Sequence, residues 1–240
     1  MEILTIVAYI MIIFCFALGL YAQIRVNIDF NTYSQVKPDS QNTTDDATQR
    51  LLDYCGLHDL RVLKTKGHLT DNYNTKNKSI NLSESTRATY SVAGIGVIAH
   101  EIGHAMQDKE KYLPFRIRQF LVPVVKIGTF AFYPLFFIGI IILCVSPETQ
   151  FGRILIIISC ALYFLSTLFY LVTWPVERNA STRALKMLTG SGLLNDNELP
   201  MARKVLKSAE LTYIATLLTS ITYFLRFFLY LLPIIAGKRD

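Results

Sequence analysis

The chain has 240 residues, of which 52% are hydrophobic, and this composition favours a membrane protein over an ordinary soluble one. The formal net charge is +6, but Lys and Arg alternate with Asp and Glu in the polar segments, which argues against a nucleic-acid-binding surface. Three of the four cysteines, Cys15, Cys144 and Cys160, lie in apolar runs. No disulfide framework is therefore expected, and a reducing compartment fits best.

Four apolar runs approach or exceed the roughly 18 to 20 residues that a helix needs to cross a bilayer. They are Ile3–Ile24, Val124–Val145, Ile154–Val176 and Leu211–Ala236. The first run follows the acidic Glu2 and shows no small-residue cleavage site, so it is predicted to be an anchor and not a removed signal peptide. Arg226 lies in the middle of the fourth run, and a charge at that depth leaves open a half-buried membrane helix instead of a span.

The polar segments indicate how the chain is oriented. Residues 25–118 and 178–207 are rich in Lys and Arg, whereas residues 146–152 contain neither, so both long polar segments are predicted to be cytoplasmic. Lys238 and Arg239 near the carboxyl end argue mildly against this orientation. The predicted organisation is a transmembrane anchor at 1–24, a cytoplasmic part at 25–122, transmembrane helices at 123–146 and 153–176, a cytoplasmic helical part at 177–210, and a transmembrane or half-buried helix at 211–236.

Short elements are expected between the first two apolar runs. A helix is predicted over Thr44–Tyr54, with Thr44 or Asp45 as its cap. Leu60–Leu63 and Ser79–Leu82 alternate like strands around a turn-rich segment, which predicts a small β-hairpin or two edge strands. The "INLS" stretch could pair within that hairpin or add an extended peptide at its edge.

A helix buried on most faces is predicted from about Ala88 to Lys109, and it contains "AHEIGHAMQ". His100 and His104 are four residues apart and therefore share one helix face, where both imidazoles can bind one cation. Glu101 follows the first histidine directly. In the HExxH pattern the histidines bind zinc and the glutamate is the general base toward the water that zinc activates.

A catalytic zinc site needs a third protein ligand. His58 and His68 are candidates, but both lie in loop-like segments. Glu177, in "WPVERNASTRALKML", follows Pro175 at the end of the third run and opens a helical pattern that ends near Gly190. Glu177 is the better candidate, although a glutamate at a helix start is also favoured by the helix dipole alone.

Four stretches in this order resemble a known family: "LTDNYNTKNKSINLS", "AHEIGHAMQ", "PVERNASTRAL" and "VLKSAELTYIA". With the apolar runs they make nearly the whole chain similar to the YugP-like neutral zinc metallopeptidases of bacterial membranes, and more distantly to the HtpX-like membrane proteases. The resemblance implies a mostly α, multi-span membrane protein with a zincin-like cytoplasmic domain. It also implies that His100, His104 and Glu177 bind Zn²⁺ and that Glu101 is the catalytic base. Asn179 stands where relatives often have an acidic residue, and it could still orient a histidine by hydrogen bonding.

Tyr213 and Arg183 are candidate oxyanion donors, against the simpler roles of an interfacial tyrosine and a helix-surface arginine. The leading hypothesis is a multi-pass zinc endopeptidase of the bacterial inner membrane that cleaves membrane or membrane-proximal proteins on the cytoplasmic side. Its expected partners are a protein or peptide substrate, the lipid bilayer and a regulatory membrane protein. Nucleic acid is not expected as a partner. The alternatives are a catalytically silent zinc-binding scaffold or partner-regulated pseudo-protease and, third, a metal transporter, which the scarcity of charges within the runs disfavours.

Overall fold

The computed structural model describes residues 2–235 and is mostly helical. The elements in chain order are α1 (Glu2–Ser34), α2 (Thr44–Tyr54), β1 (Arg61–Thr65), β2 (Asn72–Asn74), β3 (Ser79–Ser83), α3 (Val92–Lys109), α4 (Leu113–Val145), α5 (Gln150–Ser191) and α6 (Leu199–Ile235). They form two compact units. The helical unit comprises Met1–Gly19, Ile117–Trp174 and Ile214–Asp240, and the site unit comprises Leu20–Arg116 and Pro175–Tyr213.

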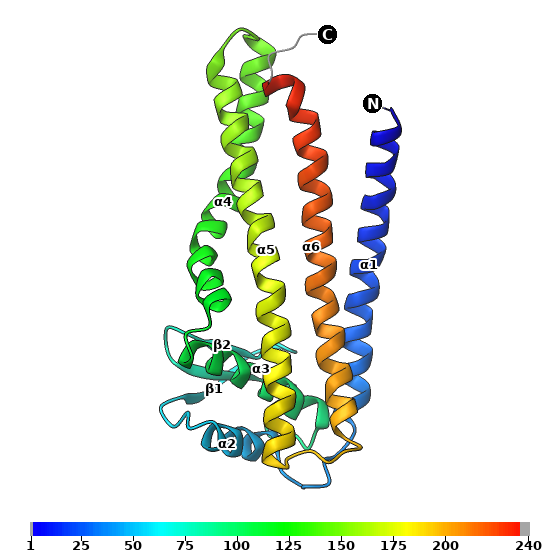
Figure 1. The fold of residues 1–240 in the computed structure, drawn as a ribbon, viewed down its shortest axis with the longest axis vertical. Helices are drawn as coiled ribbons and strands as arrows, with labels where there is room; N and C mark the ends of the chain where they lie inside the picture. Colours follow the sequence, from blue (N-terminus) through cyan, green and yellow to red (C-terminus); the bar gives the residue numbers. More distant parts are fainter. Residues whose placement is uncertain (1, 236–240) are drawn as a thin grey trace. The chain divides into compact units, whose positions relative to one another are not determined.

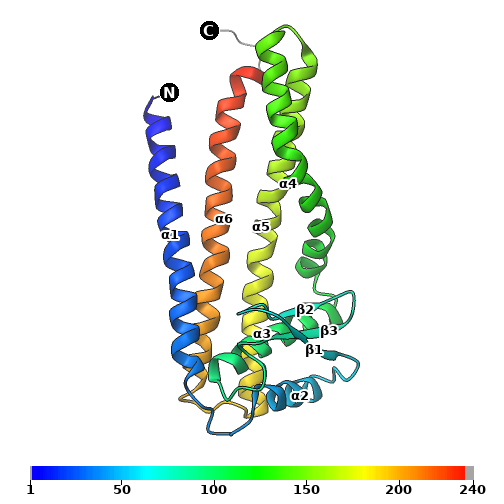
Figure 2. The same ribbon diagram turned by 180° about the vertical axis from the view of Figure 1, so that it is seen from behind.

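In the helical unit, α4 and α5 lie side by side and are joined by a short turn (Figures 1 and 2). Glycines permit this contact, since a Cβ on Gly139 would lie 3.0 Å from the Gly152 carbonyl oxygen. The buried side chains of Ile156, Cys160 and Leu231 form its core, with phenylalanines from α4 and α6 packed around them. Pro123 and Pro134 both lie inside α4.

Within residues 2–235, four helices are long and apolar enough to cross a membrane, as the sequence predicts: Ile6–Ser34, Leu113–Val145, Gln150–Ser191 and Leu199–Leu229. Arg226, the charge in the fourth run, has a partner within the helical unit. Its Nη2 donates to the Tyr9 hydroxyl at 2.9 Å, and its guanidinium carbon lies 4.3 Å from the centre of the Tyr9 ring. A charge held by a hydrogen bond and a cation–π contact is less costly at membrane depth than an unpaired one.

The predicted hairpin of Leu60–Leu63 with Ser79–Leu82 is wrong. The site unit has a three-stranded sheet in the order β1-β3-β2, in which β1 pairs with β3 in parallel and β2 pairs with β3 antiparallel. The reason is that the intervening turn-rich segment forms a third strand, β2, and reverses direction twice. Because β3 has a neighbour on each side, "INLS" cannot bind a peptide by edge addition.

The sheet and α2 pack against α3 to form the core of the site unit (Figure 2). α2 has the predicted range, but its cap is Thr43, whose hydroxyl forms a capping box with Asp46. The motif helix begins at Val92, later than predicted, because the Ser91 hydroxyl accepts from the Gly94 N–H at 2.9 Å and caps it there. Pro175 does not start a new helix after the third run, because α5 continues through it.

Candidate metal centre

The motif histidines lie on α3, a helix buried along most of its length. Their spacing puts the rings of His100 and His104 edge to face, with centroids 4.7 Å apart. Phe115 stacks on the other side of His104, with a centroid distance of 5.9 Å. The two imidazoles are therefore held by packing, which reduces the entropy lost when both bind one ion.

Gly103 allows α3 to lie very close to α5. A Cβ at this position would be only 2.6 Å from the carbonyl oxygen of Ala180. Ala180 is three residues after Glu177 on α5, so the contact occurs one helical turn from that carboxylate. The glycine within the HEIGH motif thus permits the helix–helix distance at which Glu177 reaches the histidines.

The three donor groups converge. The Nε2 atom of His100 lies 3.1 Å from Oε2 of Glu177, and the Nε2 atom of His104 lies 3.5 Å from the same oxygen. Glu177 is only 2% exposed. One ligand atom from each residue lies within 4.8 Å of the other two. Two imidazole nitrogens and one carboxylate oxygen are a donor set typical of catalytic zinc, so the residues fit the ion.

Hydrogen bonds determine which nitrogen of His104 faces the centre. The Gln107 Nε2 amide donates to the carbonyl of Val176 at 2.8 Å and to Oδ1 of Asn179 at 2.9 Å. The Gln107 oxygen must then face His104 Nδ1, 2.9 Å away, and that nitrogen carries the proton. This tautomer leaves the lone pair of Nε2 directed at the centre, as metal binding requires.

Asn179 is itself held by Arg183, whose Nε donates to Oδ1 of Asn179 at 2.7 Å. A further nitrogen of Arg183 lies 2.7 Å from the Glu110 carboxylate, which lowers the pKa of Glu110. The result is a chain of hydrogen bonds from Arg183 through Asn179 and Gln107 to His104. On the other side, Nδ1 of His100 lies 3.1 Å from the Ser181 hydroxyl.

Glu101 faces β2, not this chain of bonds, and is 9% exposed. Its Oε2 accepts a hydrogen bond of 2.7 Å from the backbone N–H of Tyr73 in β2. Burial raises the pKa of Glu101 to about 7, with the Glu177 charge adding to the rise and the nearby His100 opposing it. A carboxyl group with a pKa near neutrality suits proton transfer in both directions.

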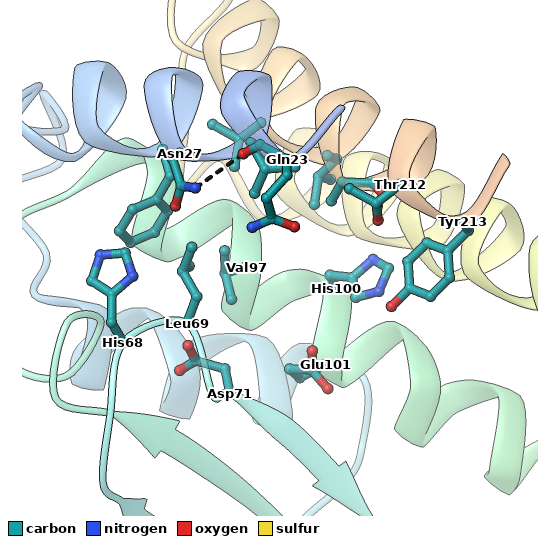
Figure 3. A pocket seen from close by; sticks show the side chains of 15 residues that line it. Gln23, Asn27, His68, Leu69, Asp71, Val97, His100, Glu101, Thr212 and Tyr213 are labelled. Atoms are coloured by element: carbon teal, nitrogen blue, oxygen red, sulfur yellow. Dashed lines mark hydrogen bonds between the residues drawn. The ribbon is translucent and has the colours of Figure 1, made fainter. Parts of the chain in front are cut away.

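A pocket of about 400 Å³ opens beside His100 and Glu101 within the site unit. Figure 3 shows Tyr213 next to His100, with its hydroxyl on the side where His100 and Glu101 lie, and Gln23 reaching in from α1. The remaining wall is largely apolar and comes from α1, α3, α6 and the loop before β2; it includes Val26, Phe30, Leu69, Val97, Val205, Leu206 and Ala209.

The structure therefore brings His100, His104, Glu177, Glu101 and Tyr213 to one place, whereas Arg183 and Asn179 contact the site through Gln107. The rejected ligand candidates lie elsewhere. The ring of His58 pairs with Asp53 at 3.4 Å on the surface. His68 lines the far part of the pocket, edge-on to Phe30 at a centroid distance of 5.4 Å.

Three contacting residues were not anticipated from the sequence: Gln107, Ser181 and Tyr73. Gln107 is three residues after His104, and Ser181 is four after Glu177. Helical periodicity places both on the ligand faces and could have identified them. Tyr73 could not have been found in this way, because its position depends on the sheet.

Paired histidines and a buried carboxylate on two neighbouring helices, beside a second carboxylate and a pocket, are an arrangement typical of zinc hydrolases. The family model described as "Putative neutral zinc metallopeptidase" matches residues 8–232, and the chain belongs to this family. It is also 37% identical over 213 residues to "Putative membrane protease YugP" of Bacillus subtilis strain 168, covering 88% of this chain and 91% of that protein. A comparison with solved structures finds none that matches.

Proposed function

We propose that the chain is a membrane-embedded zinc-dependent endopeptidase that hydrolyses peptide bonds of membrane or membrane-proximal proteins. The observation that carries this proposal is the convergence of three ligand atoms next to a separate, buried carboxylate. His100, His104 and Glu177 lie within 4.8 Å of one another, and Glu101 faces the adjacent pocket. A site that only held a metal would not need this fourth group.

His100, His104 and Glu177 would hold the ion. Zinc bound there would supply Lewis-acid chemistry, which makes a water molecule acidic enough to lose its proton near neutral pH. Glu101 accepts that proton and later delivers it to the leaving amine. The fixed Nδ1 proton of His104 keeps its Nε2 available as a ligand throughout.

Of the two candidate oxyanion donors, Tyr213 is the one we propose. It lines the pocket beside His100, where its hydroxyl can meet a substrate carbonyl. Arg183 uses its guanidinium on Asn179 and Glu110, so we assign it, with Asn179, to the orientation of Gln107 and His104.

We propose that the centre acts on the cytoplasmic side of a bacterial inner membrane. Residues 25–118, which contain the motif helix, and residues 178–207, which directly follow Glu177, hold most of the Lys and Arg of the chain, and such segments are retained in the cytoplasm. We also propose the membrane and cytoplasmic segments with the boundaries that the sequence predicts.

The test is a substrate-trapping comparison. Membrane fractions of cells that express the wild-type protein or Glu101→Gln are analysed by quantitative proteomics. An active peptidase predicts proteins that are shortened by the wild type and that accumulate intact, bound to the variant. Identical proteomes would instead support the catalytically silent scaffold.

A further inference from the structure

The proposed base, Glu101, is hydrogen-bonded to an edge strand of the sheet. β2 has three residues and, in the part of the chain that the structure describes, one strand neighbour, β3. Its middle residue, Tyr73, directs its backbone N–H away from β3 and donates it to Oε2 of Glu101 at 2.7 Å. A strand this short with a single neighbour has little stability of its own, so something else must hold it against the glutamate.

The side chain of Tyr73 provides that second attachment. Its hydroxyl donates to Oδ2 of Asp108 at 2.7 Å, and Lys78 Nζ lies 2.5 Å from the same oxygen. Burial and the Asp108 carboxylate raise the pKa of Tyr73, so the hydroxyl keeps the proton that it donates. Lys78 is 57% exposed and therefore adds little to the attachment.

Both acceptors are on one helix. Asp108 is seven residues after Glu101 in α3, which is two turns on the same face and about 10 Å along the axis. Tyr73 thus bridges α3 at two points, through its backbone at Glu101 and through its hydroxyl at Asp108.

We propose that Tyr73 is a positioning residue for the general base, because its bond to Asp108 keeps the β2 backbone N–H on Oε2 of Glu101. With Oε2 held by this bond, rotation of the carboxylate is restricted, and Oε1 is left for proton transfer. The catalytic consequence rests on the proposed peptidase function, whereas the attachment of β2 to Glu101 does not.

The test compares Tyr73→Phe, which removes only the hydroxyl, with Tyr90→Phe as a matched control on an exposed tyrosine (48% exposed). Amide hydrogen exchange of the peptide containing Tyr73, zinc content, kcat and KM are measured on each protein. We expect Tyr73→Phe to keep its zinc and its KM, to lose about tenfold in kcat, and to exchange the Tyr73 amide about tenfold faster. The control should match the wild type.

A double-mutant cycle with Asp108→Ala then tests the connection. If Tyr73 and Asp108 act as one unit, the double variant is about tenfold slower, and not about a hundredfold slower. Glu101→Ala should speed the exchange of the Tyr73 amide, and this measurement does not depend on an activity assay. If the wild type cleaves no peptide, the proposed function fails, and the exchange results alone decide on the attachment.

Two results would overturn the proposal. One is a Tyr73→Phe protein with kcat and amide exchange equal to those of the control. The other is a protein that loses its zinc and shows a raised KM together with a lowered kcat, which would give Tyr73 a general structural role.

Discussion

Replacing Gly103 by alanine should weaken zinc binding by separating two helices. The added Cβ would lie 2.6 Å from the Ala180 oxygen, where ordinary contact begins at 3.4 Å, so α3 and α5 must move apart by about 0.8 Å. The obstructing atom is backbone, and no side chain can rotate away. Zinc–ligand distances tolerate changes of about 0.2 Å, so the histidines of α3 and the glutamate of α5 can no longer share one ion at good geometry.

The expected size follows from overpacking a close contact, which costs about 1–3 kcal/mol. If this cost is relieved by separating the ligands, zinc binding weakens about 5- to 150-fold. Affinity is measured in detergent by competition with a chromophoric chelator. Gly96→Ala is the matched control, because it lies in the same helix and gains the same propensity of about 1 kcal/mol. The nearest atom to its added Cβ would be the Ala202 methyl group at 3.3 Å, and the backbone atoms of Ala202 lie at 3.6 Å and beyond. Unchanged affinity in Gly103→Ala would refute the role of the close contact.

The third ligand is tested by metal analysis: Glu177→Ala should lose the single bound zinc while His58→Ala retains it, and the opposite pattern would reject the assignment. Gln107→Ala should lower zinc affinity about 10- to 100-fold, because His104 loses the acceptor that fixes its tautomer; an unchanged affinity in the chelator competition would show that this bond has no such role. A cysteine introduced at Lys76 should react with a membrane-impermeant thiol reagent only after the cells are opened, and labelling of intact cells would contradict the cytoplasmic orientation.

Local patterns in the sequence are sufficient to predict most of the helices. The range of α2 and the existence of the motif helix follow from apolar spacing and capping residues, and the four candidate spans follow from length and composition. The predicted hairpin is wrong because the turn-rich segment forms a third strand, β2, so that β1 and β3 run parallel. Likewise, Pro175 signals a helix boundary in isolation, but α5 continues through it.

The residues of the candidate metal centre likewise fall into those that local spacing predicts and those that depend on tertiary packing. His100, Glu101 and His104 follow from spacing within one helix, whereas the role of Glu177 depends on which distant segment packs against that helix. The bonds that orient these groups join separate elements: Gln107 of α3 meets α5, and Tyr73 of β2 meets α3. Arg183 lies four residues after Asn179 on α5, a contact that helical periodicity predicts, whereas its pairing with Glu110 depends on the tertiary arrangement.

The most direct test of the peptidase proposal is the Glu101→Gln variant, with zinc content, melting temperature and peptide cleavage measured on one preparation. The glutamine oxygen can still accept the Tyr73 N–H, and a neutral side chain removes the cost of burying a charge, so we expect an equal or higher melting temperature and full zinc. Cleavage should fall about 10²- to 10⁴-fold, because the base is lost. A folded, zinc-loaded variant that cleaves as fast as the wild type would contradict the account.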